Sequence, residues 1–164
     1  MVFLVALIVL TFALALLNLL LTYGIIRRLN LSHPALADVK PLLPDEDIGD
    51  FETATTRGKS LSGAQLRGTT TVGFFTPGCQ PCEEKLPAFV EFAQANIGNA
   101  LAVIVANSSA EADPMVARTE KFADVVVEPY GGPVCSAFAI TGTPVVMTLN
   151  ERRVVQIGLP AKAA

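Results

Sequence analysis

The sequence lacks charge in its first part and lacks basic clusters throughout. No Asp, Glu, Lys, Arg or His occurs before Arg27, and the chain of 164 residues carries a formal net charge of -3. Without a run of Lys or Arg the chain has no segment suited to phosphate backbones, so we expect no nucleic acid among its partners. A tetrahedral zinc site needs four ligands, yet the sequence has only three Cys and one His, His33. We therefore expect no metal site and no cofactor.

The uncharged segment 1–26 consists mainly of Leu, Val, Ile, Ala and Phe. In helical geometry it would reach about 39 Å, compared with about 30 Å for the hydrocarbon core of a bilayer. A cleaved secretory signal would need a basic region before a shorter apolar core and small residues after it, and this segment has neither. We therefore expect an uncleaved transmembrane anchor over 1–28, with Arg27 and Arg28 at the lipid head groups and 1–26 in the bilayer.

The part that follows the anchor changes character twice. Residues 29–47 contain Pro34, Pro41, Pro44 and an acidic run at 45–47, which favours an extended, solvated spacer. From residue 48 onward, β-branched and apolar runs alternate with helical patterns. We expect strands at 51–55, 60–61, 69–76, 101–106, 125–127, 145–149 and 154–157, and helices at 62–66, from the cysteines to about Ile97, at 113–122 and at 133–138. This alternation predicts an α/β sandwich with a partly parallel sheet and flanking helices.

Two cysteines, Cys79 and Cys82, stand where a strand ends and a helix begins. Residues three apart lie on one helical face, so their sulfurs can close a disulfide without unwinding the helix. The helix N-terminus favours a thiolate at Cys79, which we expect to be the attacking sulfur, while Cys82 lies one turn inside and would resolve a mixed disulfide. Pro81 would set the backbone of the first turn, where a missing N–H is least costly. A static disulfide is the structural alternative to this redox chemistry.

The segment 74–82, Phe-Phe-Thr-Pro-Gly-Cys-Gln-Pro-Cys, together with Pro87 and the later Gly142-Thr143-Pro144, resembles the thioredoxin superfamily. The lead-in 51–68 resembles its membrane-anchored branch, which includes TlpA, ResA and MauD. The resemblance covers roughly 48–158 and implies a thioredoxin-like domain over 48–164. It implies that Pro144 is a cis proline facing the cysteines and that Thr143 offers backbone groups to a substrate strand beside Cys79.

Three departures from that family pattern affect the site. Gly78 stands where thioredoxins usually have Trp, and the chain has no Trp. The thioredoxin buried carboxylate would align with Gly73, and the acidic residue of ResA-like proteins would align with Lys85. The proton acceptor for Cys82 is therefore unassigned, and Glu83 or Glu84 would be the alternative. The usual last helix of the fold is also expected to be absent, which would leave one face of the sheet less covered.

Several functions are compatible with these patterns. The leading one is a membrane-tethered thiol-disulfide oxidoreductase acting on client proteins that contain cysteines or disulfides, with a redox partner in the membrane as a further candidate. A peroxidase of the peroxiredoxin kind would use Thr76 three residues before Cys79, but Val72 stands where its proline would be. A non-catalytic module, such as a copper-delivery protein, would need a His that 48–164 lacks. Cys135 is expected to be a small buried core residue, with a third redox partner as the alternative.

Two arguments place the domain that follows the span on opposite sides of the membrane. Arg27, Arg28 and Lys40 all follow the span, and by the positive-inside rule this favours a cytoplasmic domain. The resemblance implies a domain facing outward, and a tethered dithiol protein is most useful where disulfides persist. We expect a single-pass protein of the cell membrane with an extracytoplasmic redox domain, although the charge rule is not satisfied. Neither the client nor the direction of electron flow follows from the sequence.

Overall fold

The computed structural model describes residues 1–32 and 42–160 and divides into two compact units, Met1–Ala37 and Asp38–Ala164. The middle of the expected spacer, 33–41, with His33, Pro34, Lys40 and Pro41, lies outside the described residues. At the carboxyl end of the spacer, Asp47 already pairs with Arg153 in an isolated β-bridge. The second unit therefore includes chain that the sequence assigned to the linker.

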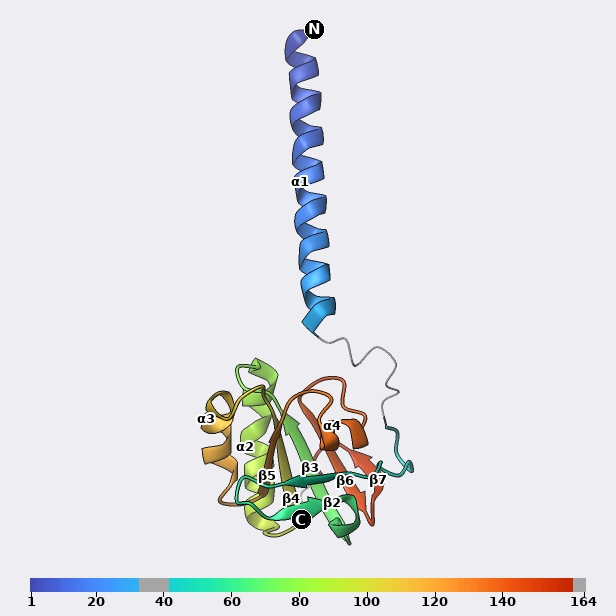
Figure 1. The fold of residues 1–164 in the computed structure, drawn as a ribbon, viewed down its shortest axis with the longest axis vertical. Coiled ribbons are helices and arrows are strands. Elements are labelled where there is room, and N and C mark those ends of the chain that lie inside the picture. Colours follow the sequence, from blue (N-terminus) through green and yellow to red (C-terminus); the bar gives the residue numbers. More distant parts are fainter. Residues whose placement is uncertain (33–41, 161–164) are drawn as a thin grey trace. The chain divides into compact units, whose positions relative to one another are not determined.

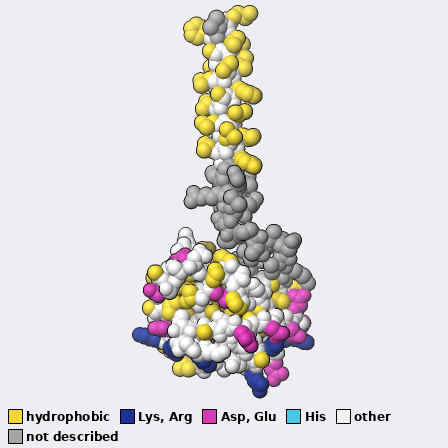
Figure 2. Space-filling model, viewed as in Figure 1, with side chains coloured by type: hydrophobic (Ala, Val, Ile, Leu, Met, Phe, Trp, Pro, Cys, Tyr) yellow, Lys and Arg dark blue, Asp and Glu magenta, His cyan; other side chains and the backbone are white. Residues whose placement is uncertain are grey.

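The first unit is one helix, α1 (Val2–Ser32), of which Phe3–Tyr23 is long and apolar enough to cross a membrane. Its 21 residues extend about 32 Å, which matches a hydrocarbon core. Hydrophobic side chains cover the coloured part of the helix on the face seen in Figure 2. The hydroxyl groups of Thr11 and Thr22 donate to the helix carbonyls of Ile8 and Asn18, so both hydroxyl groups are paired within the helix.

The second unit is built on a five-stranded mixed sheet with the order β5-β4-β3-β6-β7 (Figure 1). β3, β4 and β5 are parallel to one another, while β6 is antiparallel to β3 and β7 is antiparallel to β6. The strands are β3 (Thr69–Phe75), β4 (Ala100–Val105), β5 (Asp124–Glu128), β6 (Val145–Asn150) and β7 (Arg153–Ile157). The expected α/β architecture with a partly parallel sheet is confirmed.

Alternate residues of the sheet face two separate cores, because successive side chains of a strand point to opposite faces. On one face, α2 (Gln80–Ala95) and α3 (Ser109–Thr119) cover Phe75, Ile104 and Val125. On the other face, α4 (Pro133–Ala137), the hairpin β1 (Glu52–Ala54) and β2 (Ser60–Ser62), and the turn η1 (Gly63–Gln65) cover Phe74 and Val103. Both faces of the sheet are therefore covered, one by α2 and α3 and the other by α4, the β1–β2 hairpin and η1.

The outermost strand β7 is covered on one side only. Val154 is fully buried, whereas Val155 and Ile157 are 47% and 50% exposed. Within the described residues, β7 is the last element of regular structure.

One predicted helix begins in a different place. The pair Asp113-Pro114 predicted a helix start, but α3 begins at Ser109 and includes Pro114. The Ser108 hydroxyl accepts the backbone N–H of Glu111, and the Glu111 carboxylate accepts that of Asn107, so these two residues cap the helix reciprocally. The earlier start places Ala112 and Met115 in the core. The predicted end of the preceding helix was also too late, because α2 stops at Ala95 and Ile97 is 77% exposed.

Candidate active site

The loop between β3 and α2 carries the two neighbouring cysteines. Cys79 is the N-cap residue of α2, and Pro81 lies in the first turn, where its missing N–H breaks no helical hydrogen bond. Gly78 precedes Cys79 with a φ of 71°, a left-handed conformation that favours glycine over any residue with a Cβ. A Trp in place of Gly78 would be strained here, which is a physical reason for this departure from the thioredoxin pattern.

The two sulfurs differ in exposure although they are adjacent. The Cys82 Sγ donates to the Cys79 Sγ at 2.7 Å, and both cysteines are free thiols. Cys82 is fully buried among Phe75, Leu86 and Phe89, while Cys79 is half-buried. Only Cys79 is therefore accessible to another protein, and Cys82 can reach it without any large movement.

The pKa of Cys82 is raised above its ordinary value, chiefly because burial removes water from its thiolate form. The hydrogen bond that it donates to Cys79 also favours the protonated form. Two contacts act in the opposite direction and lower the pKa of Cys82: the backbone N–H of Thr76, 3.4 Å from the sulfur, and the side chain of Thr143. The raising effects are the larger ones, so Cys82 is a thiol at neutral pH.

The peptide bond between Thr143 and Pro144 is cis, as the resemblance implied. The carbonyl oxygen of Thr143 lies 4.0 Å from the Cys79 Sγ, although Thr143 is 64 residues further along the chain. Both Thr143 and Pro144 are half-buried and directly precede β6, the strand next to β3 in the sheet. The sheet order therefore brings together Cys79, Cys82, Thr143 and Pro144, with Pro81 exposed on the first turn of α2.

The structure adds a cluster of three hydroxyl groups that sequence patterns did not identify. The Thr143 Oγ1 lies 2.7 Å from the Thr76 Oγ1 and 3.1 Å from the Tyr130 hydroxyl, and the latter two lie 3.3 Å apart. In the sequence, Thr76 belongs to the 74–82 motif and enters the peroxiredoxin comparison, but neither gives its hydroxyl a role, and nothing in the spacing around Tyr130 points to the cysteines. We call Thr76, Tyr130 and Thr143 the hydroxyl cluster.

The two carboxylates considered as proton acceptors lie on the exposed side of α2. Glu83 accepts from the Arg118 guanidinium at 2.5 Å, and Glu84 accepts from the Gln80 amide at 3.0 Å. Lys85 is also exposed. Among the described contacts of the Cys82 sulfur there is no carboxylate, so neither Glu83 nor Glu84 is placed to take its proton.

The third cysteine, Cys135, lies in α4 within the core of the opposite face. It is 1% exposed, which agrees with the expected core role. Burial and the nearby Glu128 carboxylate both raise the pKa of the Cys135 thiol, so it is kept protonated. Glu128 itself is buried and accepts the backbone N–H groups of Val134 and Cys135, which satisfies two of the free donors at the start of α4.

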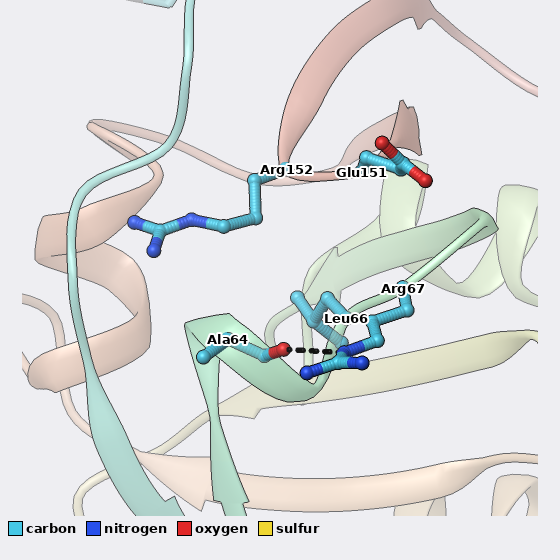
Figure 3. A pocket seen from close by; sticks show the side chains of 5 residues that line it. All are labelled: Ala64, Leu66, Arg67, Glu151 and Arg152. Carbon is cyan, nitrogen blue, oxygen red and sulfur yellow. Dashed lines mark hydrogen bonds between the residues drawn. The ribbon is translucent and has the colours of Figure 1, made fainter.

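One hollow in the described part of the chain lies away from the cysteines. Its volume is about 290 Å³, and it lies between η1 and the β6–β7 turn, lined by Ala64, Leu66, Arg67, Glu151 and Arg152 (Figure 3). These residues are at the opposite end of β3 from Cys79, and Arg152 is engaged by Asp50. This hollow is therefore separate from the cysteine site.

Comparisons with known proteins agree with this architecture. No family model matches the sequence, and no curated protein sequence matches it. Solved structures do match, among them the thioredoxin domain of a thiol-disulfide oxidoreductase from Bacteroides vulgatus, with a TM-score of 0.60 and 15% identity, covering 73% of this chain and 91% of that one. A thiol:disulfide interchange protein from Bacteroides sp. matches with a TM-score of 0.58 and 16% identity over 73% and 83% of the two chains. A secreted disulfide oxidoreductase of Mycobacterium tuberculosis, homologous to E. coli DsbE, matches with a TM-score of 0.56 and 17% identity over 70% and 86%. Residues 42–160 therefore form a thioredoxin-like domain, and the chain has the thioredoxin fold behind an apolar helix long enough to span a membrane.

Proposed function

We propose that this protein is a membrane-tethered thiol-disulfide oxidoreductase that exchanges electrons with cysteines of client proteins through Cys79 and Cys82. The observation that carries the proposal is the pairing of a half-buried sulfur at a helix N-terminus with a fully buried sulfur 2.7 Å away. An accessible sulfur can form a bond to a client, and a sheltered one can then release that client. The names of the structural neighbours given above support the same chemistry.

The exchange with a client disulfide would proceed in two displacements. The Cys79 thiolate attacks one client sulfur, the client S–S bond breaks, and the other client sulfur leaves as a thiolate that takes up a proton. Cys82 then loses its proton and attacks the Cys79 sulfur, which forms the Cys79–Cys82 disulfide and releases the second client sulfur. The client gains two electrons and the protein loses two, and the reverse sequence oxidises a client dithiol.

Thr143, Pro144 and Pro81 would position the client rather than react with it. The Thr143 carbonyl borders the Cys79 sulfur, so an extended client segment that pairs with this backbone would bring its own sulfur to Cys79. Pro144 has no N–H to donate on that backbone, and Pro81 is exposed in the first turn of α2.

We further propose that α1 tethers the domain to the cell membrane and that the domain faces the extracytoplasmic side. The length and composition of Phe3–Tyr23 support the tether. The outward orientation is supported by the need for a dedicated dithiol protein where disulfides persist, against the positive charges that follow the span.

The direct test is equilibration of the full chain, in detergent, with a series of glutathione redox buffers. We expect one reversible two-electron transition between Cys79/Cys82 dithiol and disulfide, and reduction or oxidation of an added disulfide protein at rates that depend on Cys79. A Cys82→Ala variant that consumes peroxide with an external thiol would instead favour the peroxidase function. Absence of any reversible disulfide would contradict the proposal.

A further inference from the structure

The hydroxyl cluster lies beside Cys82, whose sulfur accepts the backbone N–H of Thr76 at 3.4 Å and whose pKa is raised by burial. Thr143 Oγ1 is within hydrogen-bond distance of both Thr76 Oγ1, at 2.7 Å, and the Tyr130 hydroxyl, at 3.1 Å. Thr76 follows β3, Tyr130 follows β5, and Thr143 precedes β6, so three separate segments meet at one point. Each of the three residues is half-buried, which shields their hydrogen bonds from full competition with water.

The hydrogen-bonding capacity of Thr143 determines what this arrangement can do. A threonine hydroxyl has one hydrogen to donate and two lone pairs to accept with. If Thr76 and Tyr130 each donate to Thr143, both lone pairs are used and the hydrogen of Thr143 is directed elsewhere. Interatomic distances place Thr143 beside the two sulfurs: its carbonyl oxygen lies 4.0 Å from the Cys79 Sγ, which is 2.7 Å from the Cys82 Sγ, and the backbone N–H of Thr76 lies 3.4 Å from the Cys82 Sγ. In agreement with this geometry, the Thr143 side chain lowers the pKa of Cys82.

The rest of the surroundings of Cys82 offers little to stabilise a thiolate. Phe75, Leu86 and Phe89 are fully buried in the same core. Gly73 on β3 has no room for a side chain, since a Cβ there would lie 2.6 Å from the Phe75 ring. Among the contacts given for Cys82, the remaining donor is the backbone N–H of Thr76.

Among the described residues, the charged and titratable groups around the site do not supply another donor to a Cys82 thiolate. From α2, the group that faces Cys82 is the Cys79 thiol, and its charge disfavours a second thiolate. The carboxylate of Glu83 is turned to Arg118 of α3, and that of Glu84 to Gln80. From the loop after β5, the Tyr130 phenol faces Thr143.

We propose that Thr76 and Tyr130 are positioning residues that orient the Thr143 hydroxyl as the hydrogen-bond donor to the Cys82 thiolate during the resolving step. The inference rests on the proposed function and deepens it. Once Cys79 is bound to a client sulfur, it no longer carries a charge. Cys82 then releases its proton to water or to the client thiolate freed in the first displacement. Thr143 stabilises the charge on Cys82 until the Cys79–Cys82 bond forms and the Cys79–client bond breaks, which releases the second client sulfur as a thiolate.

The test separates the two displacements with the disulfide reagent 5,5′-dithiobis(2-nitrobenzoate) and the reduced full chain in detergent. Attack by Cys79 releases a first thionitrobenzoate, and resolution by Cys82 releases a second, so the two phases report the two cysteines separately. The pH at which the second phase reaches half its maximal rate reports the ionisation of Cys82.

We expect Thr143→Val to slow the second phase at neutral pH by about ten- to a hundredfold, as the loss of a hydrogen bond to a charged group implies. The pH midpoint of the second phase should move to a higher value, because removing a donor to the Cys82 thiolate raises the pKa of Cys82. Thr143→Ser keeps the hydroxyl and should remain near wild type. Tyr130→Phe and Thr76→Val should each slow the second phase several-fold with a smaller upward shift, and the first phase should not change.

The matched control is Thr148→Val, which removes a hydroxyl from the buried pair Thr71–Thr148 elsewhere in the same sheet. It should leave both phases unchanged. Unaltered midpoints in Thr143→Val and Tyr130→Phe would overturn the inference, as would equal slowing at every pH, which indicates a structural role. If Thr143→Ser is as slow as Thr143→Val, the hydroxyl is not the active group. A wild-type protein that releases no second thionitrobenzoate contradicts the proposed function itself, and the inference with it.

Discussion

The ring of Phe89 lies directly against the backbone of Gly73, so that a Cβ on Gly73 would be 2.8 Å from the ring carbon Cε2. Phe75 closes the same space from the strand, with its ring 5.3 Å from that of Phe89 between centroids. The position where thioredoxins carry a buried carboxylate is thus filled by two aromatic rings. Cys82 therefore packs in the same apolar cluster as these two rings, which explains why burial is the largest cause of the raised pKa of its thiol.

Gly73→Ala should lower the free energy of unfolding by about 1–3 kcal/mol, because an added methyl group would overlap two rings that are fixed in the core. Pulse proteolysis of the full chain across a urea series measures this change. Gly142→Ala is the control, since a Cβ at Gly142 meets no atom within 4 Å. Equal stability of the Gly73→Ala variant and the wild type would show that the two rings can move aside.

Substituting the two reactive cysteines should give opposite phenotypes. Cys79→Ser should abolish exchange, because the remaining sulfur is fully buried, whereas Cys82→Ser should accumulate mixed disulfides that nothing resolves. Non-reducing electrophoresis after incubation with a disulfide protein distinguishes these outcomes. Equal trapping by both variants would mean that the roles of the two sulfurs are not distinct.

Cys135 should take no part in exchange. Its thiol is buried and its pKa is raised above the ordinary value of 9.0, so a thiol reagent should not label it in the folded protein at pH 7 to 9. Because the unfolded thiol ionises first, the stability that Cys135 provides should decline as the pH rises above about 9. Cys135→Ala should leave the exchange rate within a factor of a few. Loss of activity in that variant would indicate a third redox partner.

Glu128 should matter for stability although it lies away from the cysteine site. Glu128→Ala would leave the N–H groups of Val134 and Cys135 buried without their acceptor, and we expect a loss of about 1–3 kcal/mol in unfolding free energy. The exposed Glu52 supplies the control variant, Glu52→Ala, which should change stability little. Pulse proteolysis again gives the comparison, and a Glu128→Ala protein as stable as this control would show that water satisfies those donors.

The orientation in the membrane can be measured on the same sulfur. After mild reduction of intact cells, a membrane-impermeant thiol reagent should label Cys79 if the domain faces outward. A Cys79→Ser variant provides the background signal. Labelling that appears only after lysis would place the domain inside, in agreement with the positive charges at Arg27 and Arg28.

The amino-acid sequence alone was enough to predict the features that depend on neighbouring residues. An uncharged run predicts the apolar helix α1, the change from β-branched residues to a helical pattern places Cys79 at a helix start, and alternating runs predict the mixed sheet. Each rests on local periodicity or on residues within one turn of each other. The cis bond before Pro144 was predicted from a motif, through its resemblance to a known family.

Only the tertiary structure decided which distant groups meet at the cysteines. Tyr130 and Thr76 approach Thr143 across separations of 13 and 67 residues. They do so because the carboxyl ends of the parallel strands β3 and β5 lie at the same end of the sheet as the start of the antiparallel strand β6. Likewise, the apolar cluster that contains Cys82 includes the rings of Phe75 and Phe89, which pack against the backbone of Gly73 because Gly73 has no side chain. A local pattern shows which face of an element is buried, but the partner across that face depends on how the whole chain packs.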